Sequence, residues 1–240
     1  MMGNYNDFSF LQTMSIEIGA SCNLQHMHKC CPINCRQKVE KELTVEEILH
    51  IMDEAIQLNF QGLFAFHFYN EPLLYADKIL QLKEQRPNYK FLLWTNGTLI
   101  DKLLKEEYDF NIFDRIVITK YKGIDATSFY QLKNLYQYVE IYEEDMDDRL
   151  NFYESKKENY ISCKKIYVEL PIDCEGNVYI CTYDWDKKYL LGNVLEQKLE
   201  DILKSDSYQN LLKGNEKRFR HIEDINDLCK YCPRPYIIRK

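Results

Sequence analysis

The sequence predicts an α/β fold, a partial (β/α) barrel followed by a small C-terminal domain built from a β-hairpin and a helix. Short apolar runs alternate with segments of helical periodicity through residues 15–139. Such alternation implies right-handed crossovers and a parallel sheet with helices outside it. The repeats are too few for a closed eight-fold barrel. Two strand-like runs on either side of "DCEG" predict the hairpin, with Gly176 near its turn.

The elements of the barrel follow one another in order. We expect strands at residues 15–20, 62–69, 89–94 and 115–119, and helices at 43–60, 76–86, 99–108 and 126–139. Thr44 and Glu47 form a capping-box pattern at the start of the first helix, and Pro87 ends the second. The apolar and aromatic run "GLFAFHFY" suits a buried parallel strand.

The pattern changes after the last of these helices. Residues 140–160 are strongly charged and lack periodicity, which is typical of a solvated linker. We therefore place a domain boundary here, between a barrel at 1–145 and a C-terminal domain at 146–240. Residues 197–212 look helical, and the closing "CKYCPRP" is too rich in proline to continue a helix.

Composition narrows the class of protein. The 240 residues are 45% hydrophobic, which excludes wholesale disorder. The net charge of −7 argues against a bulk nucleic-acid binder. The N-terminus has no signal-peptide pattern, and no apolar run approaches the roughly 18 residues of a membrane span. We therefore expect a cytoplasmic protein, in which clustered cysteines more often hold metal than form disulfides.

The cysteines fall into two groups. Residues 22–35, directly after the first strand, contain Cys22, Cys30, Cys31 and Cys35, together with His26 and His28. The second group consists of Cys163, Cys181, Cys229 and Cys232. Thiolates are soft ligands that suit zinc or an iron–sulfur cluster, and the spacing alone leaves both open.

Several motifs together resemble the radical S-adenosylmethionine (SAM) enzymes. A strand followed by "CNL" resembles the start of the cluster loop of that family, and "FHFYNEPLL" at 66–74 resembles its second-strand motif. "WTNG" at 94–97 is similar to a turn beside the SAM site. The resemblance implies that SAM is bound by Tyr69, Asn70, Glu71, Pro72, Thr95 and Asn96.

The C-terminal part resembles the Twitch domain, a shortened form of the SPASM domain. Cys163, Gly176 and Cys181 match the spacing of that pattern, and Cys229 and Cys232 match its closing pair. The resemblance implies one auxiliary cluster held by the four cysteines of the second group. The implied cofactors are two [4Fe–4S] clusters and SAM, and the rival for the second group is a structural zinc.

The first loop departs from the usual pattern of the family, because His26 stands where a cysteine is expected. The SAM cluster would then be held by Cys22 and Cys35 together with either Cys30 or Cys31. His26 or His28 could replace one thiolate, as imidazole does in some clusters.

The resemblance implies an oxidoreductase. In the family, an electron from the cluster cleaves SAM to a 5′-deoxyadenosyl radical, which removes hydrogen from the substrate. We expect a small-molecule or peptide substrate, dehydrogenation or epimerisation, and an external electron donor such as flavodoxin or ferredoxin. Cys174 at the hairpin tip is a candidate catalytic hydrogen donor, or a plain turn residue. The alternatives are a zinc-stabilised binding module and a degenerate cluster-binding protein that does not cleave SAM.

Overall fold

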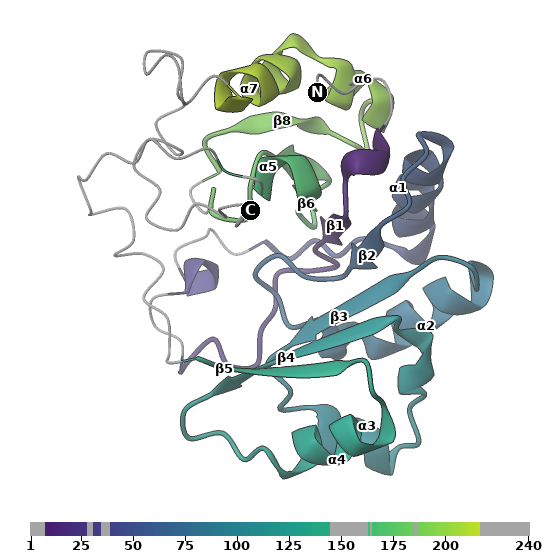
Figure 1. Cartoon of the computed structure of the whole chain (residues 1–240), viewed down its shortest axis with the longest axis vertical. Coiled ribbons are helices and arrows are strands. Elements are labelled where there is room, and N and C mark those ends of the chain that lie inside the picture. Colours follow the sequence, from purple (N-terminus) through teal and green to yellow (C-terminus); the bar gives the residue numbers. More distant parts are fainter. Residues whose placement is uncertain are drawn as a thin grey trace.

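A computed structural model describes residues 8–27, 31–34, 39–144, 163, 165–184 and 187–216 (Figure 1). Its strands are β1 (Thr13–Ile16), β2 (Leu63–Ala65), β3 (Phe91–Thr95), β4 (Arg115–Tyr121), β5 (Val139–Glu144), β6 (Glu169–Ile172), β7 (Asn177–Tyr179) and β8 (Leu190–Asn193). Its α-helices are α1 (Val45–Gln57), α2 (Ala76–Gln85), α3 (Ile100–Lys105), α4 (Thr127–Leu135), α5 (Lys165–Val168), α6 (Leu199–Lys204) and α7 (Asp206–Glu216). Short 3-10 helices cover η1 (Phe8–Phe10), η2 (Pro32–Asn34), η3 (Pro72–Tyr75) and η4 (Phe110–Ile112).

The described strands form one eight-stranded sheet in the order β5-β4-β3-β2-β1-β6-β7-β8. Strands β1 to β6 are parallel, and β7 and β8 add to the sheet in antiparallel fashion. In Figure 1, α1 to α4 accompany the half of the sheet that ends at β5, and α6 and α7 lie near β8. The predicted α/β class with a partial barrel is confirmed.

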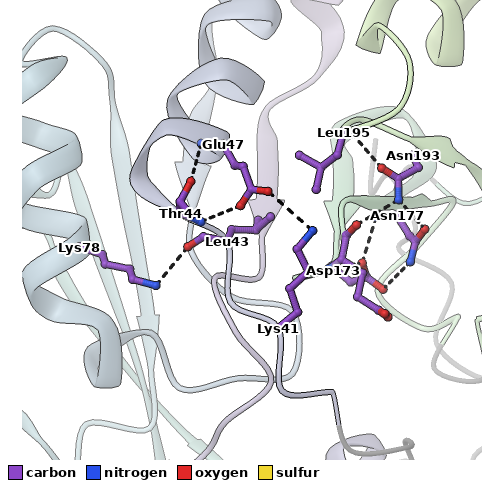
Figure 2. A network of polar contacts seen from close by, with 10 residues as sticks. Lys41, Leu43, Thr44, Glu47, Lys78, Asp173, Asn177, Asn193 and Leu195 are labelled. Carbon is purple, nitrogen blue, oxygen red and sulfur yellow. Dashed lines mark hydrogen bonds and ion pairs between the residues drawn. The ribbon is translucent and has the colours of Figure 1, made fainter.

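The C-terminal segment is joined to the barrel through β1. Met14 lies opposite Phe64 of β2 on one side and Leu170 of β6 on the other. The predicted hairpin is therefore a continuation of the barrel sheet, with its turn held by Asp173 and Asn177 (Figure 2). The boundary between 145 and 146 lies outside the described residues, so the division into 1–145 and 146–240 stays a prediction.

The first predicted helix is confirmed together with its cap. The Thr44 hydroxyl accepts from the Glu47 N–H at 3.1 Å, and the Glu47 carboxylate accepts from the Thr44 N–H at 2.8 Å (Figure 2). The second predicted helix also ends before Pro87, as expected.

Two predicted strand boundaries were wrong. The first strand, β1, begins two residues and ends four residues earlier than expected, and Gly19 beyond it makes only an isolated bridge with Glu42. The second strand is much shorter than expected, because Asn70 folds the chain back after Phe66. Its side chain accepts from the Phe68 N–H and donates to the Phe66 carbonyl.

The acidic segment at 139–144 is strand β5, where we expected a helix end and a linker. Its acidic side chains form cross-strand ion pairs with β4. Glu140 pairs with Arg115, and Glu143 pairs with Lys120. Charged side chains are common on the last strand of a sheet, where they discourage pairing with another chain.

The single helix expected at 197–212 is two helices, α6 and α7. Ser205 between them has an extended backbone, with φ −60° and ψ 148°. Its hydroxyl accepts from the Tyr208 N–H, as an N-terminal helix cap does.

The core lies between the sheet and its helices, and strand alternation decides which residues enter it. Phe91, Leu93, Ile116 and Ile118 belong to this main core. Their neighbours at alternate positions form a separate small cluster on the opposite face, made of Ala65, Leu92 and Val117. No helix in the described ranges is long and apolar enough to cross a membrane.

Thr44→Ala tests the helix cap. We expect the free energy of unfolding to fall by about 1 kcal/mol in urea titrations, because one helix N–H loses its acceptor. Thr44→Ser, which keeps the hydroxyl, serves as the control. An equal loss for both variants would mean that the threonine methyl group, and not the cap, provides the stability.

Candidate active site

A cavity of about 240 Å³ opens on the inner face of the sheet. The apolar cluster of Ala65, Leu92 and Val117 covers the part of this face that lies nearer the amino ends of the strands. Two residues further along the same strands come His67, Trp94 and Thr119, which line the cavity. The cavity therefore lies towards the carboxyl ends of the parallel strands, where α/β barrels carry their chemistry.

Glu71 is the buried carboxylate of this cavity, with 2% of its surface exposed. It accepts from the Thr95 hydroxyl at 2.6 Å, from the Asn96 N–H at 2.9 Å and from the Leu73 N–H at 3.1 Å. Burial raises the pKa of Glu71 to about 7, against the lowering effect of these three donors. Glu71 therefore fastens the loop after β2 to the loop after β3.

Asn96 extends this connection to the first cysteine loop. Its side-chain nitrogen donates to the side-chain oxygen Oδ1 of Asn23 at 2.9 Å and lies 4.0 Å from the Cys22 sulfur. The next residue, Gly97, has a φ of +78°, and a Cβ there would lie 2.5 Å from the Phe129 ring. The turn after β3 therefore requires glycine, and it holds Asn96 beside Cys22.

Cys22 and Cys31 both line the cavity. Burial raises the pKa of the Cys22 thiol to about 11. A bound metal would offset this effect, because its positive charge favours the thiolate. Two soft sulfur donors facing one cavity fit an iron–sulfur cluster in chemistry.

The remaining cluster ligands cannot be assigned among the described residues. Cys30, Cys35 and His28 lie outside them, and His26 is exposed and not part of the cavity lining. Within the described ranges, no group of three or more histidine, cysteine or acidic side chains is placed to hold a metal ion.

Tyr69, Asn70 and Pro72 shape the loop that carries Glu71. The Tyr69 N–H donates to Glu17, and its hydroxyl donates to the carbonyl of Thr182 in the loop after β7. Asn70 uses its side chain to hold the turn, and Pro72 begins η3. Tyr69 and Asn70 line the cavity, as do Thr95 and Asn96.

The described cysteines of the second group are both buried. The Cys163 sulfur accepts from the Lys165 N–H and the Cys181 sulfur from the Tyr183 N–H, each at 3.4 Å. Such N–H groups are suited to stabilise a thiolate. Cys229 and Cys232 lie outside the described residues.

Cys174, the candidate hydrogen donor, lies in the turn between β6 and β7. It is fully buried and does not line the cavity. The same turn contains Gly176, whose φ is +86° and whose Cβ would lie 2.6 Å from Leu195. Gly176 therefore occupies the turn position for which the sequence motif requires glycine.

The sequence analysis did not identify two charged residues of the cavity, Lys165 and Glu169. Residues 166–172 look like one strand, but the chain first makes the helical turn α5. Lys165 and Glu169 are four positions apart in the sequence, and the helical turn brings their side chains to the same side, where they form an ion pair. Side chains alternate between the two faces of a strand, so Glu169 lies on the same face as Pro171. This alternation was the sequence signal that could have placed Glu169 on the inner face.

Comparisons with known proteins cover most of the chain. A family model described as an iron–sulfur cluster-binding domain, SPASM, matches residues 163–233. The S-adenosyl-L-methionine-dependent 2-deoxy-scyllo-inosamine dehydrogenase of Niallia circulans is 26% identical over 235 residues, covering 91% of each chain.

Two solved structures show the same fold. The crystal structure of BtrN in complex with AdoMet and 2-DOIA is 23% identical, covers 93% of each chain and has a TM-score of 0.71. Streptococcus suis SuiB bound to S-adenosylmethionine is 13% identical, with a TM-score of 0.51 over 86% of this chain and 66% of that one.

Glu71→Gln tests the role of the buried carboxylate. The glutamine amide turns one acceptor into a donor that faces other donors, so we expect unfolding free energy to fall by about 1–3 kcal/mol. Urea unfolding of the apoprotein measures this loss. Glu84→Gln on the exposed face of α2 is the matched control. Equal stability of the two variants would contradict the assigned network.

Proposed function

We propose, on the premise that this chain belongs to the radical SAM enzymes with a SPASM/Twitch-type cluster domain, that it dehydrogenates an alcohol of a small hydroxylated molecule. One observation carries the proposal. Two thiols, Cys22 and Cys31, share a cavity with the network of Glu71, Thr95 and Asn96, and the same cavity has further polar walls.

We assign the SAM cluster to the loop at 22–35. Cys22 and Cys31 would be two of its ligands, with Cys35 as the third, and Cys30 remains the alternative to Cys31. The support is that both described sulfurs face the cavity and that Asn96 lies close to Cys22. Thiolate ligands and an open site for SAM are what such a cluster requires.

SAM would lie along the loops after β2 and β3. Tyr69, Asn70 and Glu71 line the cavity there, as do Thr95 and Asn96, while Pro72 sets the backbone of the loop. The side chains of Glu71 and Asn70 are occupied by protein donors, so they would act by fixing the loop backbone. Backbone groups of a rigid loop can then bind the amino end of SAM.

The auxiliary cluster would be held by Cys163 and Cys181 with Cys229 and Cys232. Tyr69 brings this region near the SAM loop, because its hydroxyl donates to the Thr182 carbonyl directly after Cys181. This hydrogen bond would hold the loop that contains Cys181 against the proposed SAM loop.

When bound by the residues assigned above, the clusters and SAM would supply the redox chemistry, namely a 5′-deoxyadenosyl radical able to accept a hydrogen atom from carbon and an acceptor for the second electron. The hydroxyl proton leaves to water or a nearby base, so an alcohol becomes a ketone. The protein positions the alcohol and limits the entry of water. An epimerisation would instead need a hydrogen donor in the cavity, and Cys174 lies outside the cavity lining.

The cellular setting is part of the proposal. We place the protein in the cytoplasm, because cysteines that are to hold iron–sulfur clusters must stay reduced. An external donor such as flavodoxin or ferredoxin would supply the electron for SAM cleavage.

Release of 5′-deoxyadenosine tests the radical SAM assignment. We expect anaerobically reconstituted protein with dithionite and SAM to release it, and Cys22→Ala to abolish release by removing a cluster ligand. Iron and sulfide analysis is the control, with Cys174→Ala expected to retain the iron of the wild type. Wild-type protein that holds iron and sulfide but releases no 5′-deoxyadenosine would refute the proposal, and bound zinc in place of iron would favour a binding module.

The mass of the product distinguishes oxidation from epimerisation. With 2-deoxy-scyllo-inosamine as the first probe, we expect a product that is lighter by two hydrogens when the reaction is run in ordinary water. A product that has lost no hydrogens in ordinary water, and that carries one carbon-bound deuterium after reaction in heavy water, would instead indicate epimerisation.

A further inference from the structure

One wall of the cavity is not used by the proposed cluster or SAM sites. Its side chains are Lys165 from α5 and Glu169 from β6, which line the cavity, and the buried Ser15 of β1 contacts Glu169 from outside the lining. The Ser15 hydroxyl donates to one oxygen of Glu169 at 3.2 Å, and Lys165 makes an ion pair with the other oxygen. We call these three residues the carboxylate wall.

Burying the two charged side chains of the carboxylate wall lowers the stability of the folded protein. The side chains of Lys165 and Glu169 are only 22% and 14% exposed. Removing two charges from water costs several kcal/mol per ion, and well-packed apolar residues often stabilise a protein better than such a pair. A role in binding explains why the pair faces the cavity.

Glu169 still has capacity to accept hydrogen bonds. Two carboxylates are among the described residues that line the cavity, Glu71 and Glu169. Glu71 already accepts from three protein donors. Among the described residues, Glu169 has two partners, whereas an ionised carboxylate has about four acceptor sites.

The neighbouring strands add an aromatic surface. Trp94 is 43% exposed and lines the cavity, with its indole N–H donating to the Thr119 hydroxyl at 2.9 Å. The His67 ring lies 5.4 Å from the Trp94 ring. A flat aromatic face together with a carboxylate suits a ring compound that has C–H faces and polar edges.

We infer that Glu169 binds the substrate by accepting a hydrogen bond from its hydroxyl or ammonium group, and that Lys165 and Ser15 are positioning residues. The inference rests on the proposed function, because it concerns the same cavity. It also narrows the substrate class. Lys165 is already paired with Glu169, so the carboxylate wall offers a substrate mainly a hydrogen-bond acceptor. It therefore fits an uncharged or cationic polyol, whereas a phosphorylated or carboxylated polyol does not fit.

Binding without turnover tests this inference. Anaerobic holoprotein with SAM and no reductant is titrated calorimetrically with three probes: 2-deoxy-scyllo-inosamine, scyllo-inositol and myo-inositol 1-phosphate. We expect at least one of the first two to bind more tightly than the phosphate. Glu169→Gln should weaken that binding roughly 10- to 100-fold, the usual effect of losing a hydrogen bond to a charged group. SAM affinity and iron content should not change.

Two further variants separate contact from structure. Glu200→Gln changes an exposed glutamate in α6 that also pairs with a lysine four residues away, and it should bind the probes like the wild type. Lys165→Met should lose affinity and Lys165→Arg should regain it, since arginine can still pair with Glu169. If Glu169→Gln loses iron or unfolds, Glu169→Asp is tested in its place. Aspartate keeps the charge, but its shorter side chain draws the carboxylate away from the substrate. We expect this variant to retain iron and to lose affinity for the probes.

The inference is overturned if Glu169→Gln, or Glu169→Asp in its place, binds the probes within twofold of the wild type. It is also overturned if the phosphate binds best, or if the wild type binds none of the three. These failures are distinct from failure of the proposed function. Wild-type protein that releases 5′-deoxyadenosine while Glu169→Gln keeps full probe affinity contradicts only the role of Glu169.

Discussion

The site depends on one carboxylate that is kept away from water. Glu71 can remain buried because three donors converge on it, one from its own loop, one from the last residue of β3 and one from the turn after β3. A buried carboxylate without such partners would cost several kcal/mol, so the donors and the acceptor must form together. This requirement fixes the turn that contains Asn96 and, through Asn96, the position of Cys22. The arrangement of the cavity therefore follows from satisfying a single buried group.

The alternation of residues along the strands gives the sheet two different faces. One face supplies the large apolar core beneath the helices, and the other carries a small apolar cluster that gives way to polar and aromatic side chains towards the strand ends. Because β6 pairs directly with β1, Lys165 and Glu169 contribute to the same cavity as the barrel loops. The proposed cluster domain and the barrel thus share a site as well as a sheet.

Local chemistry was predictable from the sequence, whereas pairing across long distances was not. The cap at Thr44 and the motif residues Glu71 and Asn96 could be recognised because each depends on neighbours within one segment or on a known pattern. Strand β5 was missed because its acidic residues resemble a linker until Arg115 and Lys120 are placed opposite them. The contact between Ser15 and Glu169 was also missed, because it exists only once β1 and β6 are paired.

The pairing of β1 with β6 also bears on how the protein is made. Ser15 and Glu169 are 154 positions apart, so a ribosome working at 5–20 residues per second needs roughly 8–30 s to travel from one to the other. During that time β2 can pair with one side of β1, but the other side presents unpaired N–H and carbonyl groups. Such an open side invites pairing with other chains until β6 has been made. An inner strand of the finished sheet is thus an edge strand of the nascent chain.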